Sequence, residues 1–184
     1  MRKRTLNKIG LKFKNSVGDV VTIIGAKNYR DMTIQFEDGN IVEGLNFNQI
    51  QKGKIRNKNN ITVYGVGYHG YGIFKAFENN KATKHYSLWK GMLKRCYSKK
   101  NLEKHPTYKD VYVCNEWHNF QNFAKWFEEN WNYEYMNNYW ELDKDILSNT
   151  SKVYSPETCC FVPIEINSLF SNINSFPKGI KKQK

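Results

Sequence analysis

The stretch LDKDILSNTSKVYSPETCCFVPIEINSLFSN, residues 142–172, decides the fold of the C-terminal half of the chain. It begins with an apolar and acidic segment, crosses a loop rich in Ser, Asn and Lys, and returns to an apolar run at Cys159. We expect a strand over residues 141–147, a second strand over residues 158–162, and a helix that begins near Pro163, where a missing N–H has no helical partner to lose. The pattern therefore predicts a β-hairpin followed by a helix.

At these positions the chain resembles the HNH, or ββα-metal, endonucleases. In that family the first strand carries an Asp-His pair, an Asn begins the second strand, and an Asn or His lies on the helix. Asp143-Lys144 corresponds to the Asp-His pair, Thr158 to the middle Asn, and Asn167 to the last position. The chain is most similar to phage-borne HNH-like proteins with an LDKD, YSPETC and N signature, and that likeness covers most of its length.

Two residues depart from the family pattern. Lys144 stands where most HNH enzymes have the histidine that serves as general base, and Thr158 replaces the middle Asn. A lysine is protonated at pH 7 unless burial or positive neighbours lower its pKa greatly, so Lys144 is a poor base. The resemblance therefore implies metal binding by Asp143 and Asn167 more strongly than it implies proton transfer.

The resemblance implies a metal-dependent DNA endonuclease with Mg²⁺ or Mn²⁺ as its cofactor, held by Asp143 and Asn167. Carboxylate and amide oxygens are suitable hard ligands for such an ion. Spacing does not choose a general base; besides a water on the metal, the candidates are His118, His105, His85 and Tyr154. The full set of candidate catalytic residues is Asp143, Lys144, Asp145, Thr158, Asn167 and His118.

The charge of the chain favours a polyanionic partner. Its 184 residues carry a formal net charge of +12, and 40% of them are hydrophobic. This composition is sufficient to bury a core, and the positive charge favours nucleic acid. No run approaches the roughly 20 apolar residues of a membrane span, and the basic start lacks a following apolar region. We therefore expect double-stranded DNA as the partner, no membrane association, and a location in the cytoplasm.

The N-terminal part has the composition of short β-strands. β-branched runs over residues 19–47 are punctuated by glycine and asparagine, and polar and apolar residues alternate over residues 33–37. The Asp38-Gly39 pair indicates a hairpin, because tight turns of the primed type need residues that tolerate positive φ. These features predict a small antiparallel sheet, of SH3-like type, that grips or presents a partner.

The expected fold class is α+β. We expect the β module with its basic arm over residues 1–50, a basic linker over residues 51–60, and an HNH-like domain over residues 61–184 that contains a helical region and a ββα-metal core at 141–172. The linker assignment follows from an abrupt change to a polar, basic composition.

Two helices are predicted between the linker and the hairpin. One spans residues 84–97, where Tyr86, Trp89, Leu93 and Cys96 share a stripe. The second is expected to begin after an Asn115 N-cap. Its aromatic stripe consists of Trp117, Phe120, Phe123, Phe127 and Trp131.

Basic residues on the linker and on the first helix are the candidate DNA contacts. A flexible positive segment can follow a phosphate backbone, and a helix with a cationic outer face can dock on a duplex. The candidates are Lys52, Lys54, Arg56, Lys58, Lys90, Lys94 and Arg95.

The cysteines favour buried thiols over a structural zinc site. The chain contains Cys96, Cys114, Cys159 and Cys160, and no two of them form a C-x-x-C pair. We therefore expect no structural zinc.

A second function remains open at this point. A chain with this scaffold that has lost catalysis would be a DNA-binding or host-protein-binding module, for example a phage inhibitor. Lys144 is the main support for this alternative. An assay for DNA cleavage in the presence of a divalent ion distinguishes this function from the nuclease.

Overall fold

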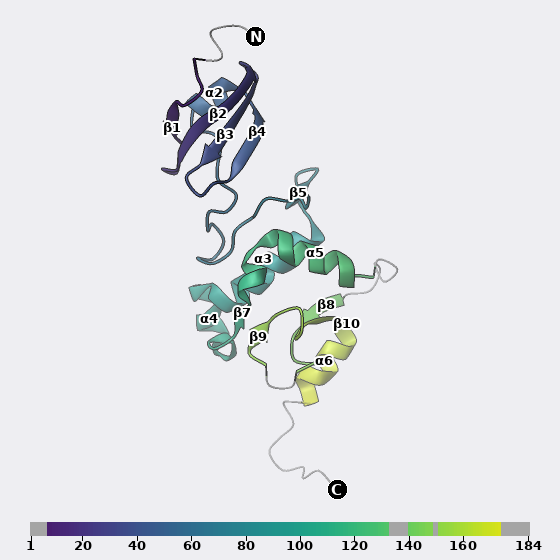
Figure 1. The fold of residues 1–184 in the computed structure, drawn as a ribbon. Coiled ribbons are helices and arrows are strands. Elements are labelled where there is room, and N and C mark those ends of the chain that lie inside the picture. The colour runs from purple at the N-terminus through teal and green to yellow at the C-terminus, as the bar shows by residue number, and fades with distance from the viewer. Residues whose placement is uncertain (1–6, 133–139, 149–150, 174–184) are drawn as a thin grey trace, which may run out of the picture. The chain divides into compact units, whose positions relative to one another are not determined.

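The computed structural model describes residues 7–132, 140–148 and 151–173, with backbone only for residues 170–173. Residues 1–6 of the expected basic arm lie outside the described residues. The chain forms two compact units, Met1–Asn60 and Ile61–Lys184, which are described separately. The fold is α+β, with a small antiparallel sheet in the first unit and helices in the second (Figure 1).

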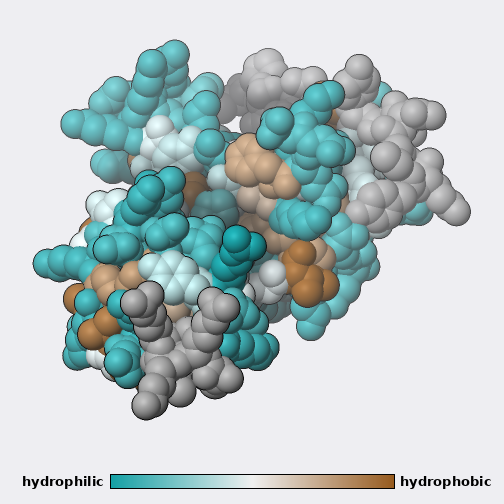
Figure 2. Space-filling model, turned by 90° about the horizontal axis from the view of Figure 1, so that it is seen from above, coloured by the Kyte–Doolittle hydropathy of each residue, from teal (hydrophilic) through white to brown (hydrophobic). Residues whose placement is uncertain are grey.

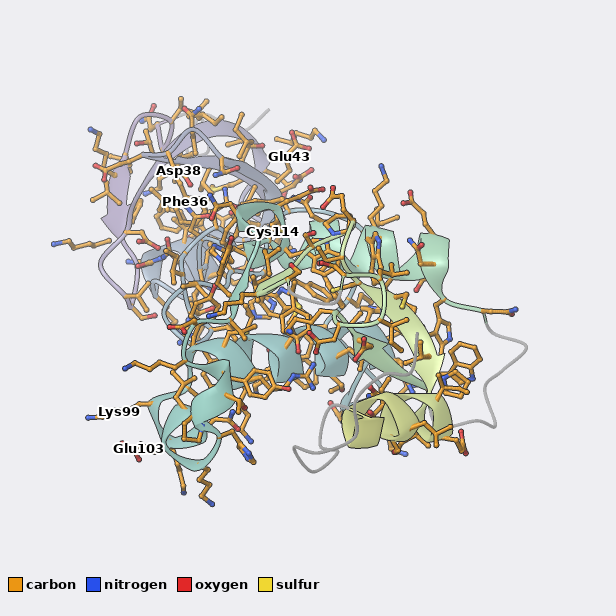
Figure 3. All side chains as sticks on the ribbon, turned by 90° about the horizontal axis from the view of Figure 1, so that it is seen from below. Phe36, Asp38, Glu43, Lys99, Glu103 and Cys114 are labelled. Atoms are coloured by element: carbon orange, nitrogen blue, oxygen red, sulfur yellow. The ribbon has the colours of Figure 1, made fainter. Side chains whose placement is uncertain are left out.

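The first unit is built on a four-stranded antiparallel sheet in the order β1-β2-β3-β4. Its strands are β1 (Lys12–Lys14), β2 (Val20–Asn28), β3 (Asp31–Phe36) and β4 (Ile41–Leu45). Buried and half-buried residues alternate along β3, as the sequence pattern predicts. Phe36 ends β3, and Asp38 lies in the turn that follows (Figure 3). The hairpin predicted at Asp38-Gly39 is confirmed, with Gly39 at a φ of 86°.

A short helix, α2 (Phe47–Gln51), completes the core of the first unit. Asn46 caps it, because its side chain accepts a hydrogen bond from the backbone N–H of Gln49 while the Gln49 side chain accepts one from the backbone N–H of Asn46. The helix contributes Phe47 and Ile50 to the core. The buried core residues are Val21, Ile23, Ala26, Met32, Ile34, Phe36, Phe47 and Ile50.

Residues 51–60, the expected basic linker, are grouped with the first unit and are hydrogen-bonded to it. The buried side chain of Asn57 donates to Oδ2 of Asp38 at 2.7 Å. Asn60 donates in the same way to Oδ2 of Asp19 at 2.8 Å. These amides pair with carboxylates in the turns of the sheet.

The second unit is centred on α3 (Lys84–Tyr97) and α5 (Phe120–Asn130), which pack against each other. Both predicted stripes are buried, and Trp89 donates from Nε1 to the carbonyl oxygen of Trp117 at 2.7 Å. The second helix begins later than expected. Residues Asn115–His118 form a 3-10 turn, η2, and Asn119 caps α5 by accepting from the N–H of Gln121.

Small elements surround these helices. Figure 3 shows Lys99 and Glu103 projecting from α4 (Lys99–Lys104). The only parallel strand pair among the described residues is β7 with β9. The elements are β5 (Phe77–Glu78), β6 (Lys81–Ala82), α4 (Lys99–Lys104), the 3-10 turn η1 (Pro106–Tyr108), β7 (Tyr112–Val113) and β9 (Val153–Tyr154).

The C-terminal part is a hairpin followed by a helix, as the sequence predicts. β8 (Trp140–Asp143) pairs antiparallel with β10 (Cys160–Pro163), and α6 (Ile164–Ile173) follows directly. Both strands are shorter than expected. β8 stops at Asp143 because its side chain accepts hydrogen bonds from the next backbone N–H groups and starts a turn.

Figure 2 shows one face of the molecule, where hydrophilic side chains predominate and hydrophobic ones form small separate groups. Across the described ranges of the chain, no helix has both the length and the apolar composition needed to cross a membrane.

Candidate functional site

The pairing of β8 with β10 decides which side chains share a face of the hairpin. Leu142 pairs with Phe161, and both pack in the core of the second unit. Successive residues of a strand point to opposite faces. Glu141 and Asp143, on either side of Leu142, therefore point together to the face away from that core.

Helix α6 packs against both strands of the hairpin, and Asn167 reaches the face that carries Glu141 and Asp143. Asn167 donates from Nδ2 to Oε2 of Glu141 at 2.7 Å. Val162, which pairs with Glu141, is buried at the same face. Asn167 thus contacts Glu141, which lies on the same strand face as Asp143.

The carboxylate of Asp143 is held in a fixed orientation. Its Oδ1 accepts the backbone N–H groups of Asp145 and Ile146, each at 2.8 Å. Both of these bonds use the same oxygen. The residue is half-buried at the end of β8. Because the two bonds fix Oδ1, the position of Oδ2 on the same carboxylate is fixed as well.

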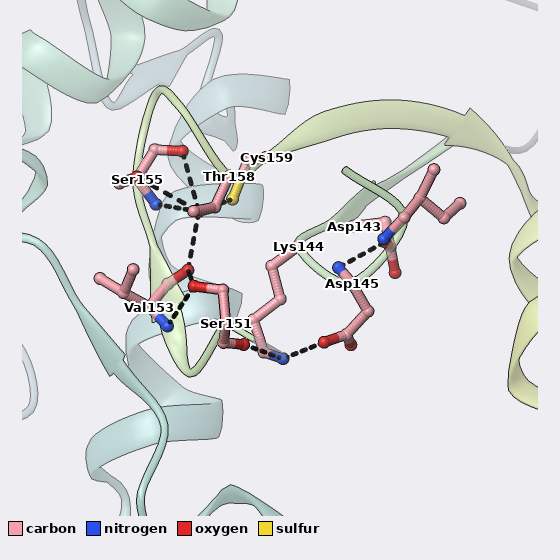
Figure 4. A network of polar contacts seen from close by, with 9 residues as sticks. Asp143, Lys144, Asp145, Ser151, Val153, Ser155, Thr158 and Cys159 are labelled. Carbon is pink, nitrogen blue, oxygen red and sulfur yellow. Dashed lines mark hydrogen bonds and ion pairs between the residues drawn. The ribbon is translucent and has the colours of Figure 1, made fainter. Parts of the chain in front are cut away.

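Lys144 is not positioned as a general base (Figure 4). Its side chain is buried, and Nζ donates to the carbonyl oxygen of Ser151 at 3.1 Å. The ammonium also forms an ion pair with Oδ1 of Asp145. Lys144 and Asp145 were both expected to take part in catalysis. In the structure they bind each other, and Lys144 also holds the loop between the strands.

Thr158 closes the turn before β10. Its hydroxyl donates to the carbonyl oxygen of Val153 at 2.7 Å and accepts from the N–H of Ser155 at 3.1 Å (Figure 4). It also lies before the first residue of β10, although we expected it to begin the strand. The hydroxyl is therefore engaged with backbone groups of its own loop.

His118 is placed with Tyr97 and not with the hairpin. Its Nε2 lies 3.4 Å from the Tyr97 hydroxyl, and the two rings are in edge contact. Burial lowers the pKa of His118, with a smaller opposing effect from a hydrogen bond to the backbone of Val113. The contacts found for it within the described residues do not bring it to Asp143.

The other candidate bases are also positioned elsewhere. Burial raises the pKa of Tyr154 far above its ordinary value, despite the nearby Arg95. His85 has Nδ1 3.6 Å from Oε1 of Glu128, and His105 is the C-cap of α4. None of these contacts places a base beside Asp143.

The two residues that the sequence resemblance assigns to a metal both carry oxygen donors. Over the described part of the chain, no group of three or more His, Cys, Asp or Glu side chains is suited to hold a metal. The candidate set is a mixed one, the carboxylate of Asp143 and the amide of Asn167. Mg²⁺ commonly takes one or two protein carboxylates and completes its shell with waters and phosphate, so a small set of this kind suits it.

Glu141 is the functional candidate that the sequence reasoning missed. It lies two positions before Asp143, and strand alternation alone would have placed it on the same face. The resemblance gave no reason to single it out, because the family motif begins at the next acid. Its contact with Asn167 appears only in the folded chain.

The four cysteines are free thiols in the second unit, and two of them, Cys159 and Cys160, are neighbours in the sequence. Cys96 and Cys159 are buried, and burial raises the pKa of Cys159 to about 12.

The candidate DNA contacts differ in exposure. The four on residues 51–60 are exposed, as are Lys90 and Lys94 on α3. Arg95 is half-buried, with its guanidinium carbon 5.6 Å from the centre of the Tyr154 ring. An open cavity of 580 Å³ in the first unit is lined by two of these candidates, Lys52 and Lys54. The rest of its lining was not expected from sequence and consists of Tyr29, Arg30, Asn46, Asn48 and Gln49.

Neither models of protein families, nor curated protein sequences, nor solved structures gave a match to this chain. At the hairpin, the structure shows a contact between Asn167 and Glu141 and a half-buried Asp143. It also offers exposed cations on both units, which suit a phosphate backbone.

Proposed function

We propose that this protein is an HNH-like DNA endonuclease that hydrolyses phosphodiester bonds with a divalent metal ion. In this proposal the hairpin and α6 form a ββα-metal motif, and the first unit is an SH3-like module that positions the duplex. The observation that supports the proposal is that Asn167 on α6 contacts Glu141 of β8, two residues before Asp143 on the same strand face.

Asp143 and Asn167 would hold the ion, Mg²⁺ or Mn²⁺. A divalent ion supplies neutralisation of negative charge on the phosphate and on the leaving oxygen. Asp143 contributes a carboxylate whose orientation is fixed through Oδ1 by two backbone N–H groups. A ligand held in this way loses little freedom when an ion binds.

The exposed basic side chains would bind the DNA backbone. Lys90 and Lys94 project from α3, and the cations of residues 51–60 belong to the first unit. Contacts of this kind release counterions, so affinity should fall steeply as salt rises. The open cavity that contains Arg30 and Lys52 has no acidic residue in its lining, which suits the same partner.

Proton transfer is the weak part of this site. Lys144 is paired with Asp145 and has its ammonium directed to Ser151, so it does not supply a base. A positioned general base commonly contributes about 10²–10⁴-fold to a rate. We therefore propose a slow nuclease, with water in the site as the route for the proton.

The test is nicking of supercoiled plasmid by the purified chain with Mg²⁺ or Mn²⁺. Asp143→Asn keeps an acceptor for the two loop N–H groups but removes the charge, so it should lose nicking while the fold stays intact. Asn167→Ala should lose it as well. Asp110→Ala removes an exposed carboxylate that pairs with Lys152 and is the matched control, expected to nick like the wild type.

A second function is favoured by one observation, the burial of Lys144 in an ion pair where the family has its base. The chain would then bind double-stranded DNA, or a host protein, without cutting. DNA binding with a steep salt dependence but without nicking under either ion would select this function over the nuclease.

A further inference from the structure

The open cavity of the first unit combines one aromatic ring with positive charge. It is lined by Tyr29 and Arg30 from the turn between β2 and β3, and by Lys52 and Lys54 from the segment that follows α2. The other lining residues carry amides and are Asn46, Asn48 and Gln49, so no carboxylate of the described residues lines the cavity. Its volume of 580 Å³ is large enough for a small ligand or for one unit of a polymer.

Tyr29 is held against α2 by its backbone and by its ring. Its carbonyl oxygen accepts the backbone N–H of Phe47 at 3.0 Å, and the centres of the two rings are 5.0 Å apart. Phe47 is buried, whereas 46% of Tyr29 is exposed. A ring that is anchored on a core residue and still exposed to solvent is a suitable surface for stacking of a flat ligand.

The three cations of the cavity are exposed and extend from fixed backbone. The backbone N–H of Arg30 donates to Oδ1 of Asn28 at 2.8 Å, and that of Lys52 donates to the carbonyl oxygen of Asn48 at 3.0 Å. Within the part of the chain that the structure describes, the charged groups of Arg30, Lys52 and Lys54 form no ion pair. Their charges are therefore available to an anionic ligand.

We propose that this cavity binds an unpaired nucleotide of DNA, with its base stacked on Tyr29 and its phosphates beside the three cations. The substrate class is then duplex DNA that carries an adjoining single strand. This inference rests on the DNA binding in the proposed function and is independent of the metal. The bases of an intact duplex are stacked on one another, so only an unpaired base can present its face to Tyr29.

A different role for the cavity predicts a different dependence on the DNA. If it contacts only the phosphates of the backbone, Tyr29 packs on Phe47 and contributes nothing to affinity. Loss of the ring would then change the binding of every DNA alike. With an unpaired base on the ring, the loss affects only DNA that offers such a base, and stacking of one base is expected to contribute roughly 5–150-fold in affinity.

The experiment measures fluorescence anisotropy of labelled DNA with the full-length chain in EDTA, which prevents metal-dependent cleavage. A duplex with a single-stranded thymidine arm is compared with the same duplex carrying an abasic arm, so that the two differ in bases and not in phosphates. Wild type should bind the thymidine arm roughly 5–150-fold more tightly than the abasic arm. Tyr29→Leu should abolish this preference, and Tyr29→Phe should keep it because the ring remains.

Tyr112→Leu is the matched control for the ring. Tyr112 is an exposed tyrosine on β7, in the second unit, and its loss should leave the preference for the thymidine arm unchanged. Thermal unfolding of each variant checks that the fold is kept. Photocrosslinking of wild type to an arm that contains 5-iodouracil, with the site located by mass spectrometry, needs no variant and should identify Tyr29.

The cations are tested through the dependence of binding on salt. Affinity for a single strand falls with a slope of about 0.7 in log affinity against log salt for each phosphate contact. Lys52→Gln should therefore reduce by about 0.7 the additional slope that the arm gives over a blunt duplex. Lys12→Gln removes an exposed cation of the same unit that does not line the cavity, and it should leave this additional slope unchanged.

Three results would overturn the inference: no preference of wild type for the thymidine arm, a preference that Tyr29→Leu retains, or crosslinks that lie only outside the cavity. If the chain still nicks plasmid in those cases, the proposed nuclease stands without the inference. A preference that depends on Tyr29 in a chain that never nicks would retain the inference and overturn the nuclease. A chain that binds no DNA overturns both.

Discussion

Lys144 donates from Nζ to the carbonyl oxygen of Ser151 at 3.1 Å. The lysine is buried, with only 8% of the residue exposed. The ion pair with Asp145 satisfies the ammonium from the other side. A buried ammonium without such partners would be very costly. Lys144 stands at the position where the HNH endonucleases have their general base. Here it holds the loop that joins the two strands of the hairpin.

We expect Lys144→Met to destabilise the second unit. Methionine fills a similar volume, but it leaves the Ser151 carbonyl without its partner, which costs about 1–3 kcal/mol. Urea unfolding followed by tryptophan fluorescence measures this, because all five tryptophans lie in the second unit. Lys152→Met is the control: that lysine pairs with Asp110 at an exposed site and should change stability by less than about 1 kcal/mol. Equal effects of the two variants would contradict the assigned role.

Lys144→His should not produce a faster nuclease. The side chain of residue 144 is directed to the Ser151 carbonyl, and its ammonium lies 6.0 Å from the centre of the Tyr154 ring, within the loop. A histidine there would enter the same buried place and would not reach the face that carries Asp143. The measurement is the rate of plasmid nicking relative to wild type, and an increase of about 10²-fold or more would show that the position can supply a base.

The local parts of the fold could be predicted from sequence. The stripes of α3 and α5 repeat every three or four residues, and the Asp38-Gly39 turn is a local signal, so no distant contact was needed. The hairpin and helix after Leu142 were predicted for the same reason. Their ends were not, because the side chain of Asp143 competes with the strand ladder for backbone N–H groups.

The roles of the site residues depended on contacts that no periodicity reveals. The bond from Asn167 to Glu141 spans 26 positions, and the parallel pairing of β7 with β9 brings together segments on either side of β8. The position of Asn57 against Asp38 depends equally on a distant turn. Patterns in the sequence report which face a residue lies on, but they do not report its partner.

Acid should destabilise the first unit through Asp38. Burial raises the pKa of Asp38, but hydrogen bonds from Asn57 and Asn40 outweigh it and hold the pKa below its ordinary value. Because the folded-state pKa is below that of the unfolded chain, this stabilisation is present above about pH 4 and is lost as the pH falls through the folded-state pKa.

Nuclear magnetic resonance signals of buried Ile34 would follow unfolding of the first unit as the pH is lowered. In Asp38→Asn the stability should be lower near neutral pH, and its difference from wild type should shrink toward pH values of about 2. Glu43→Gln, an exposed change on β4, should give a difference that does not vary in this way. A constant difference for Asp38→Asn would show that its hydrogen bonds do not favour the charged form.

Gly67 is the position where the core of the second unit should tolerate no side chain. A Cβ there would lie 2.5 Å from Cδ1 of Leu93 and 2.9 Å from Cζ2 of Trp89, and both of these residues are fully buried. The backbone has little freedom to move away, because Gly67 and Val63 exchange hydrogen bonds at 2.8 and 3.0 Å. We expect Gly67→Ala to cost about 1–3 kcal/mol by overpacking.

Gly91 provides the matched substitution for Gly67. It lies within α3, and a Cβ there would meet no atom within 4 Å. Gly91→Ala should stabilise the second unit by about 0.5–1 kcal/mol, since alanine loses less backbone freedom in a helix. Thermal unfolding followed by tryptophan fluorescence should therefore give shifts of opposite sign for the two variants. A Gly67→Ala protein as stable as wild type would mean that the approach of this backbone segment to α3 is looser than the structure has it.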